Sequence, residues 1–180
     1  MVNLKNTLFL VMGLTFFSCA TDYYITEGGG TRSRWYYKTY LNKRINPKDI
    51  GITPKAVYLS SYFYKNNKRY TNKSAGRNHK TYFVSYENGT SYLFYKDTAI
   101  ALNKESFNPN KGNICFLIKR YKKPILKTYS FVDGGHFLTS KIKVRGDTII
   151  THSKNSPDEF YSFYIKQEFP KEWLNFTPDY

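Results

Sequence analysis

Cys19 is the residue whose type and position most clearly indicate a chemical reaction. It follows the run from Thr7 to Phe17, which is apolar apart from its threonines and one glycine, and Lys5 is the only charge before it. A positively charged N-terminal region, a short apolar run and a small residue before the cleavage site form a secretory signal peptide. A thiol placed here can carry a thioether-linked diacylglycerol. We therefore expect a signal peptide over residues 1–18 and lipidation at Cys19.

The segment Phe16-Phe17-Ser18-Cys19 resembles a bacterial lipobox, in which a small residue precedes the lipidated cysteine. Phe17 stands where leucine is usual, and boxes of this kind are looser in Bacteroidota. Each buried methylene contributes about 0.8 kcal/mol, so two or more acyl chains hold a protein stably on a membrane. An ordinary signal peptide with an incidental cysteine, or an uncleaved signal anchor, is the alternative. The expected location is the cell envelope, lipid-anchored in the outer membrane.

The other reactive residue types do not occur in catalytic or metal-binding combinations. His79, His136 and His152 lie in different segments, with no Cys, His or acid at a metal-ligand spacing. Cys115 sits between Ile114 and Phe116, where a buried, inert thiol is expected. The sequence therefore predicts no enzyme, no cofactor and no metal site. A hydrolase whose active site we do not recognise is kept as a third hypothesis, after the two binding functions given at the end of this section.

The net charge of +15 is distributed unevenly. Residues 31–80 hold thirteen Lys or Arg against one acid, Asp49, whereas residues 81–180 hold fourteen bases against ten acids. A field of this sign attracts polyanions and anionic head groups. The basic charge also has a compositional explanation. Lysine outnumbers arginine 21 to 7, and AT-rich codons favour lysine over arginine.

Bases and aromatic residues alternate early in the mature chain. The candidate binding residues are Arg32, Arg34, Trp35, Tyr36, Tyr37, Lys38, Lys43 and Arg44. Such a mixture can stack on single-stranded nucleic acid, but a protein outside the cytoplasm seldom meets nucleic acid. The expected partners are the membrane, through the N-terminal lipid, and anionic polysaccharide or head groups. The oligomeric state is left open.

From residue 56 onward, short runs rich in β-branched and aromatic residues alternate with turn residues, as in strands. The expected strands are Ala56–Tyr64, Thr81–Tyr86, Thr90–Tyr95, Asn113–Tyr121, Ile125–Val132, His136–Val144, Thr148–Ser153 and Glu159–Lys166. Glu87-Asn88-Gly89 is the clearest hairpin turn, because Asn-Gly accommodates the positive φ that a tight turn demands. Residues 70–79 and about 96–112 are expected to be loops.

Strands joined by tight turns must be antiparallel, since parallel pairing needs long crossovers. We therefore expect a mainly β fold, an antiparallel meander of about eight strands that forms a lipocalin-like barrel or half-barrel, with a β-sandwich as the alternative. Residues 19–55 are expected to form a lipidated tether and basic segment, with Gly28 to Gly30 flexible and a short helix around Ser33 to Leu41. The β domain is expected over residues 56–180.

Several motifs occur in one order: the lipobox, the Glu87-Asn88-Gly89 hairpin, the 108–112 turn, the 146–149 turn and the tail from Pro170 to Tyr180. This ordered set resembles small, largely uncharacterised lipoproteins of Bacteroidota. The resemblance covers roughly residues 56–180. It implies a β-rich, lipocalin-like domain and brings no catalytic residues.

Tyrosines are expected to share one face of several strands. They are Tyr58, Tyr62, Tyr64, Tyr82, Tyr86 and Tyr161. Tyrosine has an apolar body and a polar tip, which suits a barrel mouth or a sugar platform. Half-buried packing on the strands is the simpler explanation of these residues. The expected function is non-catalytic binding or support of the envelope, directed at an anionic polymer or surface. A lipocalin-like carrier of a small apolar ligand is the alternative.

Overall fold

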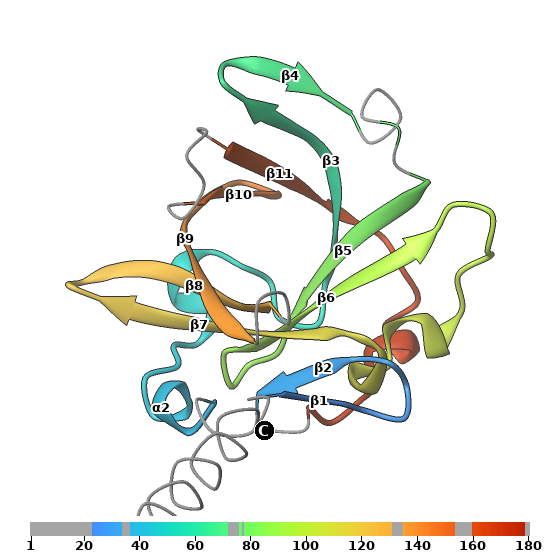
Figure 1. The fold of residues 1–180 in the computed structure, drawn as a ribbon, viewed down its shortest axis with the longest axis horizontal. Helices are drawn as coiled ribbons and strands as arrows, with labels where there is room; N and C mark the ends of the chain where they lie inside the picture. The colour runs from blue at the N-terminus through green and yellow to red at the C-terminus, as the bar shows by residue number, and fades with distance from the viewer. Residues whose placement is uncertain are drawn as a thin grey trace, which may run out of the picture.

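The computed structural model describes residues 23–33, 37–71, 76, 78–130, 135–153 and 160–178. Its architecture is mainly β: eight antiparallel strands close into a barrel, and one further strand lies beside it. Figure 1 looks into the ring of strands. The lipocalin-like barrel predicted from the sequence is confirmed, and the sandwich is not the fold. Cys19 and the predicted signal lie outside the described residues.

The barrel strands follow one another in chain order around the ring. They are β3 (Val57–Lys65), β5 (His79–Ser85), β6 (Thr90–Asp97), β7 (Asn113–Arg120), β8 (Lys123–Ser130), β9 (His136–Arg145), β10 (Thr148–Ser153) and β11 (Phe160–Gln167). β11 pairs with β3 along its whole length, and this pairing closes the ring. All eight strands predicted from the sequence are present, with ends shifted by no more than two residues.

Shorter elements surround the barrel. They are β1 (Tyr23–Ile25), β2 (Thr31–Ser33), α2 (Tyr37–Leu41), η2 (Pro47–Ile50), β4 (Lys68–Tyr70), η3 (Lys104–Phe107), η4 (Pro109–Lys111) and η6 (Lys171–Leu174). β3 pairs with β5 at its first residues and with β4 at its last. The sequence did not predict β4, whose last residue, Tyr70, falls in the loop expected at residues 70–79. No helix in the described ranges is long and apolar enough to cross a membrane.

One hydrophobic cluster lies inside the barrel and draws residues from all eight strands. It contains Ile52, Ala56, Tyr58, Phe83, Leu93, Cys115, Leu117, Leu126, Ile142 and Ile149, with Val144 and Tyr164 packed against it. The segment before β3 contributes Ile45, Ile50 and Ile52 to this cluster. Residues ahead of position 56 therefore belong to the core of the barrel.

A second cluster covers the outer face of β3 and β5–β8. Its buried residues include Tyr82, Val84, Tyr92, Phe94, Phe107, Ile114, Phe116, Ile118 and Leu174. α2 packs on this face through Tyr40 and Leu41, and η6 packs through Trp173 and Leu174. α2 also reaches the start of β9, where Tyr40 packs on Phe137, but no described covering element packs on the rest of β9 or on the outer faces of β10 and β11. Among the described residues, that stretch of sheet is the less covered part of the barrel wall.

The flexible tether expected at Gly28 to Gly30 is wrong. β1 and β2 pair as a hairpin around these glycines, and the Gly30 amide donates to the Asn110 carbonyl at 2.8 Å. A Cβ on Gly30 would lie 2.5 Å from the Gly112 carbonyl oxygen, so only glycine permits this close approach. The described chain is packed on the barrel from Tyr23 onward, and no break in packing marks residue 56.

A β-bulge in β3 divides the tyrosines that were expected on one face. Phe163 pairs with Tyr62 and Tyr164 pairs with Ser60, which leaves one extra residue on β3. A bulge of this kind reverses the alternation of faces beyond it. Tyr58 therefore packs inside the barrel, whereas Tyr62 and Tyr64 lie on its outside.

Candidate functional site

Arg32, the first residue of the predicted basic cluster, is not at the surface. Its side chain is fully buried (0% exposed). Its guanidinium donates to the carbonyls of Gly112 at 2.7 Å and Pro109 at 2.6 Å, and it lies 5.1 Å from the centre of the Tyr92 ring. Arg32 thus fastens the β1–β2 hairpin to the 109–112 turn and cannot face an anionic surface.

The remaining cluster residues do not form one described patch. Arg44 is half-buried and donates through Nε to the Leu41 carbonyl at 3.0 Å and through its guanidinium to Thr90. Burial lowers the pKa of Arg44. Tyr37 packs against the outer cluster, so Lys38 and Lys43 are the exposed cations that remain. Arg34, Trp35 and Tyr36 lie outside the described residues.

Cys115 is buried inside the barrel, as the sequence predicted. Its sulfur contacts Thr128 Oγ1 at 3.6 Å. Burial raises the pKa of the thiol to about 12, which keeps it protonated at neutral pH. Within the described ranges, no three Cys, His, Asp or Glu side chains converge to hold a metal ion.

A groove lies where the β7–β8 hairpin separates from β9. β8 pairs with β9 only from Ile125 onward, opposite Lys141, so Lys123 and Pro124 pair with β7 alone. Pro124 has no backbone N–H to donate and cannot extend a ladder on both sides. The hairpin therefore projects beyond the barrel and leaves a gap between its base and β9.

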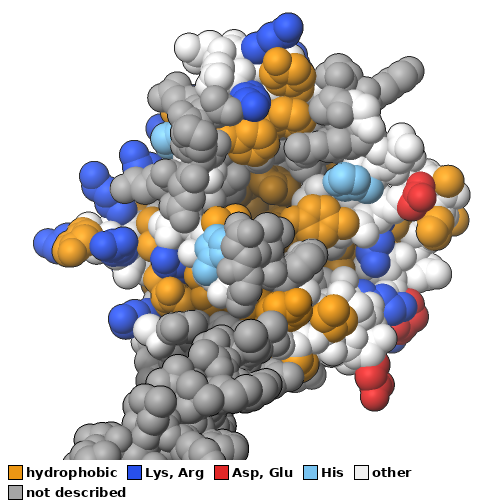
Figure 2. Space-filling model, in the orientation of Figure 1, with side chains coloured by type: hydrophobic (Ala, Val, Ile, Leu, Met, Phe, Trp, Pro, Cys, Tyr) orange, Lys and Arg blue, Asp and Glu red, His pale blue; other side chains and the backbone are white. Residues whose placement is uncertain are grey.

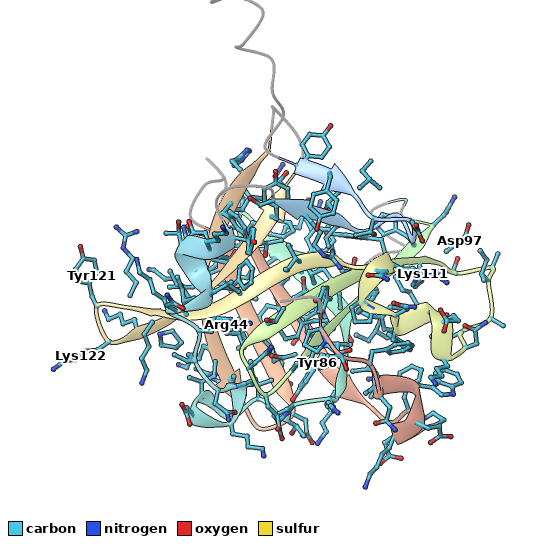
Figure 3. All side chains as sticks on the ribbon, turned by 90° about the horizontal axis from the view of Figure 1, so that it is seen from below. Arg44, Tyr86, Asp97, Lys111, Tyr121 and Lys122 are labelled. Atoms are coloured by element: carbon cyan, nitrogen blue, oxygen red, sulfur yellow. The ribbon has the colours of Figure 1, made fainter. Side chains whose placement is uncertain are left out.

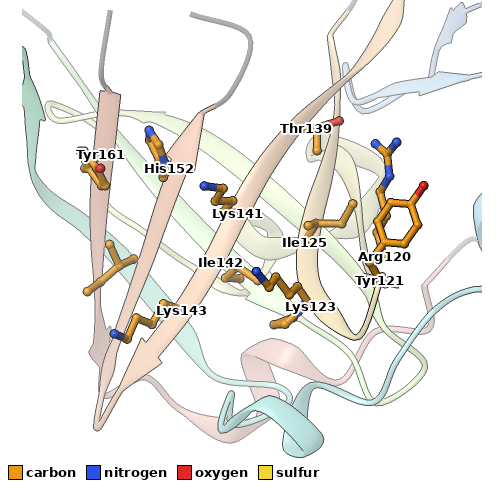
Figure 4. A pocket seen from close by; sticks show the side chains of 12 residues that line it. Arg120, Tyr121, Lys123, Ile125, Thr139, Lys141, Ile142, Lys143, His152 and Tyr161 are labelled. Carbon is orange, nitrogen blue, oxygen red and sulfur yellow. The ribbon is translucent and has the colours of Figure 1, made fainter.

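The groove has a volume of about 750 Å³. Its lining comes from the hairpin and from β8, β9, β10 and β11, as Figure 4 shows. Apolar side chains are Pro124, Ile125, Ile142 and Ile150; polar and charged ones are Arg120, Lys123, Thr139, Lys141, Lys143 and His152, with Tyr121 and Tyr161. This combination of an apolar lining with convergent polar groups is typical of ligand sites.

The charged side chains of the groove have one sign. Arg120, Lys123, Lys141 and Lys143 line it, and no described lining residue is acidic. Figure 2 shows Lys and Arg side chains gathered over the projecting hairpin, at the left, whereas the visible acidic side chains lie at the opposite side. Cations that converge on a concave surface raise the local concentration of anions. The arrangement can bind an anion by charge-assisted hydrogen bonds.

Lys127 lies near the base of the same hairpin but is already engaged. Its ammonium donates to Thr139 Oγ1 at 2.6 Å and lies 5.5 Å from the Tyr40 ring centre. Burial, with a smaller contribution from the charge of Arg120, lowers the pKa of Lys127. The more exposed Lys141 and Lys143 are therefore better placed to meet a ligand.

The tip of the hairpin has an unusual turn. Tyr121 and Lys122 both adopt left-handed backbone angles, with φ of 50° and 63°, although Asn-Gly is the preferred pair for a two-residue turn of this kind. The Tyr121 side chain is 85% exposed. Figure 3 shows both residues at the outermost point of the hairpin. Strained residues of this kind cluster at functional sites.

The binding residues predicted from the sequence do not include any residue of this groove, although the sequence carries a signal for it. Lys141, Lys143 and Arg145 alternate with Ile142 and Val144, which predicts a strand with one basic face. Summing the charge over residues 81–180 hides this alternation, because the acids of that region lie elsewhere in the chain.

Comparison with protein-family models, curated proteins and solved structures finds no match. The groove is therefore interpreted from its own geometry and charge.

Proposed function

We propose that this protein is a lipid-anchored component of the cell envelope that binds an anionic polymer or surface without catalysing a reaction. One observation carries the proposal: four cations, and no described acid, line a groove of about 750 Å³. Within the described ranges, the groove lies on a part of the barrel wall that the outer cluster with α2 and η6 does not cover. We place the binding site in the groove and not in the cluster from Arg32 to Arg44 that the sequence predicted, since Arg32 is buried and Arg44 donates to protein groups.

Neutralising the groove is expected to weaken anion binding strongly. A lysine near an anionic surface contributes about 1 kcal/mol, so Lys141→Gln with Lys143→Gln is expected to lower affinity for polyphosphate roughly 30-fold. The matched control is Lys38→Gln with Lys43→Gln, which removes the same charge from the exposed remainder of the predicted cluster. Isothermal titration calorimetry of the purified full chain measures both variants.

The control pair is expected to change affinity less than threefold, and binding by the unaltered protein is expected to weaken as salt rises, because salt screens exposed charges. Equal losses in the two pairs would show that net charge alone attracts the ligand. A larger loss of affinity in the Lys38 and Lys43 variant would show that the binding site is the cluster predicted from the sequence.

The lipid anchor is tested separately at Cys19. We expect radioactive palmitate to label the protein in growing cells, and Cys19→Ser to abolish the label and release the protein from the membrane fraction. The matched control is Cys115→Ser, because the second thiol is buried inside the barrel. Label that survives Cys19→Ser would remove the anchor from the proposal and leave the groove untouched.

The inside of the barrel supports a second candidate, a carrier of a small apolar ligand. Four side chains face the inside of the barrel because their cross-strand partners do, yet each is only half-buried. They are Thr128, Leu138, Ser140 and Ser162. Figure 2 shows hydrophobic side chains around a hollow at the centre of this face. Binding inside the barrel would respond neither to salt nor to the Lys141 and Lys143 variants, so the same titrations separate the two candidates.

A further inference from the structure

Aromatic rings stand on both sides of the cations in the groove. Figure 4 shows Tyr161 and His152 at one side and Tyr121 at the other, with Lys141 and Lys123 between them. The Tyr161 and His152 rings are stacked, with centroids 4.3 Å apart and planes 8° from parallel. The site therefore alternates ring, cation and ring across its width.

We infer that the ligand of the groove is an acidic polysaccharide, an inference that rests on the proposed function. A sugar ring offers a flat face of C–H groups that packs on an aromatic ring, and the polar tip of tyrosine suits its hydroxyls. The carboxylates of such a chain accept hydrogen bonds from lysine and arginine. A polyanion without rings uses the cations alone, and a bilayer is too flat to enter a gap between two strands.

The aromatic surface continues beyond the groove, which favours a polymer over a single sugar. Tyr161 pairs across the sheet with Tyr64 on β3. The Tyr64 ring lies 5.7 Å from Phe163, and Phe163 stacks on Tyr62 at 4.5 Å between centroids. Arg69 on β4 lies 4.3 Å from the centre of the Tyr62 ring. A chain that leaves the groove at Tyr161 thus meets three more rings and then another cation.

The test compares two anions of equal charge, an oligogalacturonate of about six sugars and a polyphosphate. The variants are Tyr121→Asn, which keeps a residue suited to the left-handed turn, and Tyr161→Thr, which keeps a good strand former. Tyr24→Asn is the control, since Tyr24 is also exposed (40%) but lies on β1. Circular dichroism checks that each variant keeps its strand content, and calorimetry measures affinity.

Each ring variant is expected to lower affinity for oligogalacturonate about 5- to 10-fold, as loss of one aromatic contact does, and to change polyphosphate affinity less than twofold. The methyl-esterified oligomer, which keeps the rings and loses the charges, is expected to bind at least 10-fold more weakly than the free acid. Equal effects on both anions, or tighter binding of a thymidine hexanucleotide or of anionic vesicles, would overturn the inference. Absence of salt-sensitive binding to any anion would instead overturn the proposed function.

Discussion

Replacing Arg32 by alanine is expected to lower the free energy of unfolding by about 4 kcal/mol. The guanidinium supplies donors to three backbone carbonyls, those of Thr31, Pro109 and Gly112. A buried carbonyl that loses its donor costs about 1–3 kcal/mol, and the emptied volume adds to the loss. Folded domains are stable by only about 5–15 kcal/mol, so this single change removes a large part of the total.

Urea unfolding followed by circular dichroism measures the Arg32 effect. Arg32→Lys is expected to recover only part of the stability, because an ammonium on a single stem does not reproduce the two-pronged geometry of the guanidinium. Arg69→Ala, which removes an exposed arginine stacked on Tyr62, is expected to cost less than about 1 kcal/mol. If Arg32→Ala unfolded at the same urea concentration as Arg69→Ala, the structural role assigned to Arg32 would be wrong.

Phe107→Ala is the second change with a large expected effect, about 3–5 kcal/mol of unfolding free energy. Phe107 is fully buried (0% exposed) at the end of η3. Its ring packs edge-on against Tyr82, Phe94 and Phe169, with centroids 5.2–5.7 Å apart. Alanine would leave a cavity that these fixed rings cannot refill.

The loop around Phe107 offers its own control. Ile100→Ala removes an apolar side chain from the same connection between β6 and β7, but Ile100 is 67% exposed. It is expected to change stability by less than about 0.5 kcal/mol. Thermal unfolding measures the stability of both variants. Comparable losses of stability would show that Phe107 does not belong to the core that joins the loop to η6.

The strands of the barrel could be predicted because local chemistry specifies them. Asn66-Asn67 and Asn88-Gly89 occupy tight turns, and positive φ angles at Asn66, Asn67 and Gly89 are those that such turns require. Between turns, β-branched and aromatic residues leave few alternatives to a strand. Turn spacing and antiparallel pairing then favour closure into a barrel. The location, the lipid anchor and the resemblance to Bacteroidota lipoproteins remain predictions.

Features that depend on distant contacts could not be predicted. The extra residue in β3 shows only against β11, about 100 positions later in the chain. Arg32 looked like a surface cation because two of its carbonyl partners, Pro109 and Gly112, become known only when β2 packs on the 109–112 turn. The groove likewise requires β8 and β9 to separate at Pro124, although the basic alternation of β9 was visible in the sequence.

If Cys19 carries the proposed lipid anchor, the packed β1–β2 hairpin limits how far the barrel can stand from a bilayer. Tyr23 already belongs to β1, and only four peptide steps separate it from Cys19. A fully extended chain spans at most about 3.6 Å per residue, so this connection reaches no more than about 14 Å. With acyl chains on Cys19, the barrel would rest at head-group level and could capture only polymers that approach the membrane closely.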